Sequence, residues 1–129
     1  LAAKELRADA SVLYAEPNYR RRKLDTLPND RYYSDQDHYR SINLPAAWDI
    51  TTGSKGIIVA VIDTGVATAG TDTPVNMLVG YDFHNDDNDA TDDHGHGTHV
   101  AGTIAQASNN GVGTMGITPN VNILPINQS

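Results

Sequence analysis

An uninterrupted run of apolar, mostly β-branched residues extends from Ile57 to Ile62 and stops at Asp63. Such a run favours a β-strand that is buried on both faces, as in a parallel sheet covered by helices. Thr64 and Gly65 follow, so we expect Asp63 at the carboxyl end of the sheet, where open α/β folds place their chemistry. The same residues also fit an ordinary turn in which the Asp caps only the neighbouring backbone. This segment alone does not decide between the two interpretations.

A second segment, 33 residues after Asp63, places His96 between two glycines. The residues that follow are rich in small side chains and contain no proline before Pro119. This composition predicts a closely packed helix from His96 to about Ala107. A neutral imidazole at the start of the helix can act as a general base when a carboxylate fixes its tautomer through the other ring nitrogen. Asp63 is the candidate for that carboxylate.

The two segments, Asp63-Thr-Gly after a Val/Ile strand and Gly-His96-Gly-Thr-His-Val-Ala-Gly-Thr, resemble the subtilisin-like serine proteases, or subtilases. The resemblance is strongest to the thermitase-like members and extends from about Asn29 to the C-terminus. It implies a parallel-sheet, three-layer α/β fold in which residues 29–129 form the N-terminal part of the catalytic domain. It also implies that Asp63 orients His96, the general base of an Asp-His-Ser triad.

The third member of that triad is missing from the sequence. In the family, the nucleophile lies in a Gly-Thr-Ser-Met-Ala segment, and the oxyanion-hole Asn lies between that segment and the His; neither occurs here. Ser108 falls in an Asn-rich loop, and Ser129 is the last residue. We therefore expect a fragment of a serine endopeptidase of peptide or protein substrates, truncated before the nucleophile and inactive without it.

The N-terminal residues resemble another part of a protease precursor. Residues 8–19 are similar to the closing strand of the inhibitory propeptide, which implies that residues 1–19 are the tail of the protein's own propeptide. Residues 20–28 open with four adjacent cations, which are best solvated, and are interpreted as an exposed linker or processing region. The family resemblance further implies a secreted, extracellular protein.

Two classes of partner are disfavoured by the sequence. Nucleic-acid binding would need aromatic residues interleaved with the cations and a companion basic surface, and neither is present. A membrane-spanning helix would need an apolar run of roughly 18 residues, which the chain does not contain. The sequence also has no Cys, which excludes disulfides and thiolate metal sites.

Charge is distributed unevenly along the chain. All nine Lys and Arg residues lie within residues 1–55, whereas residues 56–129 contain eight Asp residues. Six of these crowd into residues 82–93, where a hard divalent cation such as calcium would reverse their mutual repulsion. This segment is not an EF-hand, but it resembles a calcium loop of thermitase-like proteases, and a solvated acidic loop is the alternative. The resemblance implies side-chain ligands from Asp82, Asp87 and Asp89, with Asn85 and Thr91 as further candidates.

A second calcium site is implied by the same resemblance. In the relatives it uses an Asp near the mature N-terminus, an Asp nine residues after the catalytic Asp, and an Asn-containing loop after the His helix. The corresponding side chains here are Asp30, Asp72 and Asn110, and carbonyl groups near Ala107, Val112 and Thr114 would complete the site. A solvated loop is again the alternative.

Two other functions stay open at this point. The spacing of His94, His96 and His99 can ligate zinc, with Asp93 as a fourth ligand in a zinc-dependent hydrolase. The metalloprotease helix signature, however, needs a Glu beside its first His, and Gly97 follows His96 here. In a subtilase, His99 would instead have a packing or hydrogen-bonding role, and His94 would lie at the surface. The other possibility is a noncatalytic calcium-binding or inhibitory module.

The remaining segments fit an α/β architecture. Residues 45–50 predict a short helix with Pro45 in its first turn, and Trp48 is expected in the core. Residues 77–83 and 121–126 predict two further strands, the second parallel to the strand that ends at Asp63.

Overall fold

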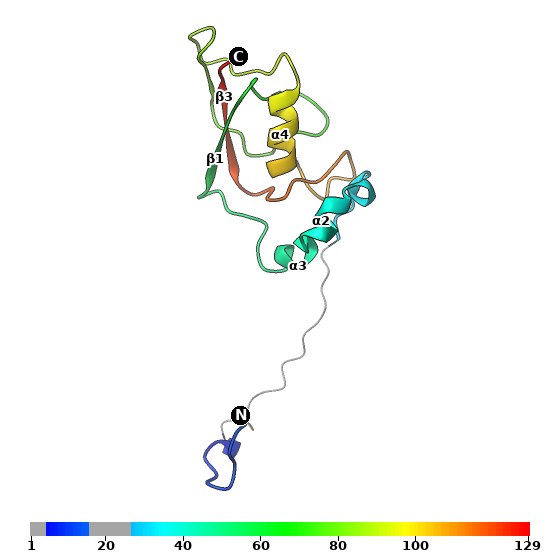
Figure 1. Cartoon of the computed structure of the whole chain (residues 1–129), viewed down its shortest axis with the longest axis vertical. Helices are drawn as coiled ribbons and strands as arrows, with labels where there is room; N and C mark the ends of the chain where they lie inside the picture. Colours follow the sequence, from blue (N-terminus) through cyan, green and yellow to red (C-terminus); the bar gives the residue numbers. More distant parts are fainter. Residues whose placement is uncertain (1–4, 16–26) are drawn as a thin grey trace.

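The computed structural model describes residues 5–15 and 27–129. Its three strands are all parallel, in the spatial order β1-β3-β2, and a helix lies between β2 and β3 in the chain. This arrangement, seen in Figure 1, confirms the predicted α/β fold with a parallel sheet. The elements are η1 (Tyr33–Asp35), α2 (Asp37–Ser41), α3 (Leu44–Trp48), β1 (Ile58–Asp63), β2 (Tyr81–Asp82), α4 (His96–Ala105) and β3 (Asn122–Asn127).

Strands β1 and β3 pair over their whole length, from Ile58 opposite Asn122 to Asp63 opposite Asn127. Both strands therefore end at the same level, and Asp63 is the last residue of β1, as the sequence predicted. The helix predicted from His96 to about Ala107 is present as α4 and ends two residues earlier, at Ala105. The close agreement reflects strong local signals, namely a β-branched run for the strand and a series of small residues for the helix.

The strand predicted over residues 77–83 is much shorter than expected. Only Tyr81 and Asp82 form β2, and Met77 makes an isolated parallel bridge to Ile123. Between these two pairings the neighbouring strand contains Pro125, which has no backbone N–H to donate. The hydrogen-bonded pairing between the two strands is interrupted there. The register also shifts by one residue between the pair Met77–Ile123 and the pair Tyr81–Ile126.

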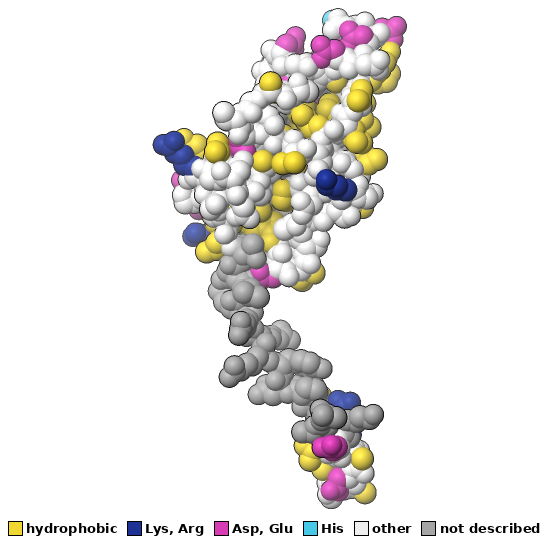
Figure 2. All heavy atoms as spheres, turned by 180° about the vertical axis from the view of Figure 1, so that it is seen from behind, with side chains coloured by type: hydrophobic (Ala, Val, Ile, Leu, Met, Phe, Trp, Pro, Cys, Tyr) yellow, Lys and Arg dark blue, Asp and Glu magenta, His cyan; other side chains and the backbone are white. Residues whose placement is uncertain are grey.

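The main core lies between α4 and one face of the sheet. The prediction that β1 is buried on both faces is wrong for the described residues, because the side chains of Ile58 and Ile62 are 57% and 59% exposed. Figure 2 shows hydrophobic side chains at the surface on the side of the molecule that carries the sheet. Helix α4 thus covers one sheet face only. The buried residues of this core are Val61, Val66, Ala101, Ala105, Val121 and Ile123.

A second cluster anchors the two short helices to the segment that leads into β3. Tyr39 and Trp48 are buried beside Met115, with the two rings packed edge to face. The indole nitrogen of Trp48 donates a hydrogen bond to the carbonyl oxygen of Ile117 at 2.8 Å, and the Tyr39 hydroxyl donates one to that of Met115. The core position predicted for Trp48 is confirmed, and the expected short helix is α3.

Residues 5–15 differ from the strand expected over residues 8–19. They form a series of turns, in which Ala8, Asp9 and Val12 each donate a backbone hydrogen bond to the carbonyl three residues earlier. The Asp9 carboxylate stabilises one turn by accepting bonds from the amide and hydroxyl of Ser11. Residues 16–19 and most of the proposed linker, residues 20–26, lie outside the described residues. None of the helices in the described ranges has the length and apolar character to cross a membrane.

Candidate active site

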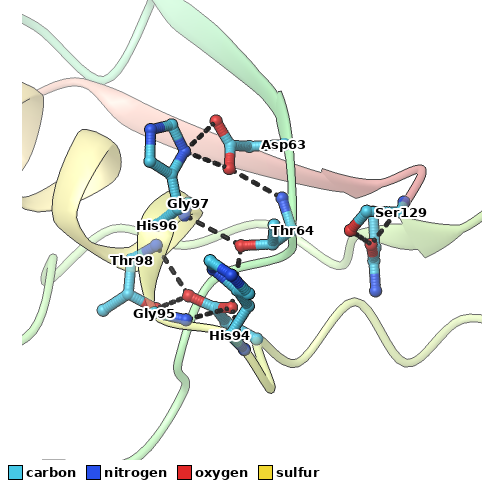
Figure 3. A network of polar contacts seen from close by, with 10 residues as sticks. Asp63, Thr64, His94, Gly95, His96, Gly97, Thr98 and Ser129 are labelled. Carbon is cyan, nitrogen blue, oxygen red and sulfur yellow. Dashed lines mark hydrogen bonds and ion pairs between the residues drawn. The ribbon is translucent and has the colours of Figure 1, made fainter.

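Asp63 and His96 meet at the carboxyl end of the sheet (Figure 3). Nδ1 of His96 lies 2.7 Å from Oδ1 and 2.9 Å from Oδ2 of Asp63. The side chain of Asp63 is 16% exposed, whereas that of His96 is 63% exposed. The contact that the sequence predicted between these two side chains is therefore present, with the imidazole on the solvent side.

The environment of Asp63 favours its ionised form. The hydrogen bond with His96 lowers the pKa of the Asp63 carboxyl most, and a bond from the backbone N–H of Thr64 at 2.8 Å lowers it further. Because a carboxylate can only accept hydrogen bonds, it selects the tautomer of His96 that carries its proton on Nδ1. The exposed Nε2 of a neutral imidazole then presents a lone pair to solvent or to a substrate. This arrangement suits general-base chemistry.

Asp92, a member of the acidic segment, is hydrogen-bonded to residues on both sides of this pair. The carboxylate of Asp92 accepts hydrogen bonds from Thr64, His94, Gly95 and Thr98. Burial raises the pKa of Asp92, but these hydrogen bonds outweigh burial and lower the pKa well below its usual range. Asp92 lies three residues ahead of Gly95, the N-cap residue of α4, and therefore outside the position at which a helix-capping carboxylate is expected, so the sequence carries no capping signal for it.

Neither serine that follows His96 in the sequence approaches the imidazole. The hydroxyl of Ser108 donates to the carbonyl oxygen of Gln106 at 3.2 Å. The hydroxyl and backbone N–H of Ser129 both donate to Oδ1 of Asn127, as Figure 3 shows. Within residues 27–129, the structure thus brings the predicted acid and base together, and both of these serines are hydrogen-bonded elsewhere.

The histidine cluster does not form a metal centre. His94 and His99 are exposed, and Nδ1 of His96 is bonded to Asp63. Among the described residues, no three His, Asp or Glu side chains are close enough to hold one ion. The zinc arrangement considered from the sequence is therefore not assembled. The surface position expected for His94 agrees with the structure, and His99, for which a packing or hydrogen-bonding role was expected, is also exposed.

The acidic segment around Asp82 likewise does not gather its carboxylates. Asp82 is buried, and its two oxygens accept bonds from the backbone N–H of His84, from the backbone N–H and side-chain amide of Asn85, and from the side chain of Asn127. These bonds, with the backbone N–H of Asn85 first, lower the pKa of Asp82 despite its burial. Asp87 and Asp89 instead accept backbone bonds from residues two positions ahead. The first predicted set, which also included Thr91, does not fit a calcium ion in this structure.

The second predicted calcium set fits better. Residues 109–114 form a loop held between Asp30 and Asp72: Oδ2 of Asp30 accepts a bond from the N–H of Asn109, and Oδ1 of Asp72 accepts one from the side-chain amide of Asn110. Oδ2 of Asp72 also accepts a bond from the N–H of Thr114. The other oxygen of Asp30, Oδ1, is buried and has no hydrogen-bond partner. A buried carboxylate oxygen without a donor is the environment that a hard cation would satisfy.

Comparison with known proteins agrees with this geometry. Residues 54–129 match the Subtilase family, and the chain belongs to this family. It is 43% identical over 124 residues to the thermophilic serine proteinase of Bacillus sp. (strain AK1), covering 95% of this chain and 31% of that protein. It is 39% identical over 100 residues to thermitase of Thermoactinomyces vulgaris, covering 77% of this chain and 36% of thermitase. Other relatives are named extracellular proteases.

A solved structure of proteases from Pseudoalteromonas arctica is also similar, with a TM-score of 0.70 and 39% identity. The match covers 78% of this chain and 38% of that one. The chain therefore spans about a third of the length of the proteins it matches. The family suggested by the two sequence motifs is confirmed. The similarity to this solved structure agrees with a subtilisin-like arrangement of the parallel sheet and α4.

Proposed function

We propose that this chain carries the acid–base half of a serine endopeptidase, with Asp63 as the orienting carboxylate and His96 as the general base. The observation that carries the proposal is the 2.7 Å contact between Oδ1 of Asp63 and Nδ1 of His96 at the carboxyl end of a parallel sheet. Membership of the subtilase family supports it. The nucleophilic serine would come from a part of the protein outside these 129 residues, so the chain by itself is expected to be inactive.

In this reaction Nε2 of His96 would remove the proton from the serine hydroxyl as its oxygen attacks the carbonyl carbon of the peptide bond. The negative charge of Asp63 would stabilise the imidazolium that forms. The imidazolium would then give its proton to the nitrogen of the departing amine, leaving an acyl-enzyme. Water, deprotonated by the same imidazole, would hydrolyse the acyl-enzyme and restore the serine.

The proposal extends to the N-terminal residues and to the location of the protein. Residues 1–19 are proposed as the tail of an inhibitory propeptide and residues 20–28 as its processing region, which leaves residues 29–129 as the first part of the catalytic domain. The adjacent cations at 20–23 support a protease-accessible linker. Relatives named extracellular proteases support a secreted protein.

Calcium is proposed as a structural ion bound by Asp30, Asp72 and Asn110. The buried, unpartnered Oδ1 of Asp30 supports it, as does the presence of eight Asp and no Lys or Arg in residues 56–129. Carbonyl oxygens near Ala107, Val112 and Thr114 would complete the coordination. The ion would neutralise this acidic region and hold the loop after α4, without entering the chemistry.

The protease proposal is tested by expressing the chain together with the sequence that follows it in its gene and measuring hydrolysis of a chromogenic peptide. His96→Ala should nearly abolish turnover, and Asp63→Asn should lower it by on the order of 10⁴. His99→Ala, an exposed histidine on the same helix, is the matched control and should retain activity. Near-normal turnover in either of the first two variants would refute the assignment.

A further inference from the structure

Asp92 holds together the two chain segments that carry the candidate acid and base. Oδ1 of Asp92 accepts bonds from the Thr64 hydroxyl at 2.8 Å and from the backbone N–H groups of His94 and Gly95 at 2.9 and 2.8 Å. Oδ2 accepts bonds from both the N–H and the hydroxyl of Thr98. The carboxylate of Asp92 thus receives five hydrogen bonds (Figure 3). One comes from the residue that follows Asp63, and four come from residues within two positions of His96.

The two hydroxyl groups extend this network by one step. The hydroxyl of Thr64, which donates to Asp92, accepts a bond from the N–H of Gly97 at 2.9 Å. The hydroxyl of Thr98 likewise accepts a bond from the N–H of Ala67 at 2.9 Å. Each threonine therefore bridges the turn after β1 and the first turn of α4. Because each hydroxyl has one proton, its donation to Asp92 leaves its lone pairs directed at these backbone N–H groups.

We propose that Asp92 is a positioning residue, whose ionised carboxylate fixes the turn after β1 against the start of α4 and so holds Asp63 in contact with His96. Its catalytic relevance rests on the proposed protease function. The contact itself does not depend on that function. Asp92 touches neither the imidazole nor the Asp63 carboxylate, and its effect is exerted through the backbone on either side of them.

An amide could not replace the carboxylate here. All five groups directed at Asp92 are N–H or O–H donors, so both oxygens must accept. In Asp92→Asn, one of the two positions becomes an NH₂ group that faces donors, whichever way the amide is turned. Either the bonds to Thr98 or the bonds to Thr64, His94 and Gly95 are lost. The substitution therefore changes the geometry while keeping the size of the side chain.

The test exploits two effects of opposite sign on Asp63. Removing a nearby negative charge lowers the pKa of a carboxyl, whereas losing the hydrogen bond from His96 raises it. Carbon-13 NMR titration of the labelled Asp63 carboxyl is measured in the 129-residue chain and in its variants Asp92→Asn and Asp93→Asn. The second variant removes the same charge one residue away, from an exposed side chain.

In Asp92→Asn we expect the pKa of Asp63 to rise toward its ordinary value of 3.8, together with loss of the His96 Nδ1 proton resonance. In Asp93→Asn we expect the pKa to stay the same or fall, with the resonance retained. An Asp63 titration that responds in the same way to both substitutions would overturn the proposal. The titration needs no nucleophile or substrate, so an inactive longer protein with these responses would refute the protease proposal alone.

If Asp92→Asn does not fold, as judged by circular dichroism, two milder substitutions at Thr98 test the proposal instead. Thr98→Val removes the hydroxyl that joins Asp92 to Ala67, while Thr98→Ser keeps it. Thr98 has no hydrogen bond to Asp63 in the structure, so any response of Asp63 must travel through the network. The proposal requires the pKa of Asp63 to rise in Thr98→Val and to remain unchanged in Thr98→Ser. No rise in the valine variant would overturn it.

Discussion

A β-carbon placed on Gly97 would lie 2.1 Å from the carbonyl oxygen of Gly65, so helix α4 and the turn after β1 meet backbone to backbone. The same β-carbon would lie 3.1 Å from the β-carbon of Asp63. No side chain separates the two segments at this point. The imidazole of the preceding residue, His96, reaches the Asp63 carboxylate because the helix can approach this closely.

This contact predicts opposite outcomes for two glycines of the same helix. Gly97→Ala should destabilise the fold by about 1–3 kcal/mol, because the methyl group meets backbone that cannot move independently. Gly102→Ala would meet only the end of the flexible Gln106 side chain, and should be neutral or stabilising by up to about 1 kcal/mol. Urea unfolding of the two variants checks the prediction. Equal stabilities would contradict the close approach at Gly97.

The parts of the fold that the sequence predicted are those with strong local determinants. The β-branched run that ends at Asp63 predicts a strand from its local sequence alone. The small residues that follow His96 predict a helix in the same way. The contact between these residues followed from placing one at the end of a strand and the other at the start of a helix. The prediction that both faces of β1 are buried was wrong, because an apolar strand sequence does not show whether another element covers its second face.

The rest depended on contacts between residues far apart in the sequence. The side chain of Asn127, at the end of β3, donates a bond to Asp82 and adds a distant donor to the bonds that Asp82 accepts from His84 and Asn85 nearby in the chain. The interruption of β2 depends on Pro125 of the neighbouring strand. Asp92 was assigned to a repulsive acidic segment because its donors, which include Thr64, come together only in the folded chain.

The lowered pKa of Asp92 predicts how its contribution to stability depends on pH. A carboxyl whose pKa is lower in the folded state stabilises the fold above its unfolded pKa, and this stabilisation is lost as pH falls through the folded pKa. Asp92→Asn should therefore lower the free energy of unfolding by about 2 kcal/mol near neutral pH. The difference from the unmodified chain should begin to shrink as pH falls through the unfolded value of 3.8, and it should continue to shrink toward the lower pKa of the folded state. Guanidinium unfolding over a pH series measures it.

The comparison variant for that series is Asp93→Asn. The carboxylate of Asp93, the residue next to Asp92 in the chain, is exposed. Loss of the Asp93 carboxylate should therefore change the free energy of unfolding by less than about 0.5 kcal/mol at any pH. If both variants lost the same stability near neutral pH, the effect would come from net charge. The hydrogen bonds to Asp92 would then contribute little.

Calcium should raise the melting temperature of the chain, because an ion that binds only the folded state stabilises it by mass action. The two candidate sets are separated by two substitutions. Asp30→Asn removes the buried carboxylate with the unpartnered oxygen and should abolish most of the calcium-dependent shift. Asp89→Asn, in the acidic segment that does not gather its carboxylates, should leave the shift intact. Differential scanning calorimetry at micromolar and millimolar calcium provides the measurement. An unchanged melting temperature at millimolar calcium would argue against the site.

Two adjacent residues of β1 should respond very differently to truncation, because they point to opposite faces of the sheet. Val61 is buried in the core against α4, and Val61→Ala should cost about 2 kcal/mol through lost burial and the cavity left behind. Ile62 is exposed on the uncovered face, and Ile62→Ala should change stability by less than about 0.5 kcal/mol. Ile62→Ala should instead reduce the fluorescence of a hydrophobic dye such as anilinonaphthalene sulfonate, because it removes apolar surface to which the dye binds. A large loss of stability in Ile62→Ala would show that something covers this face in solution.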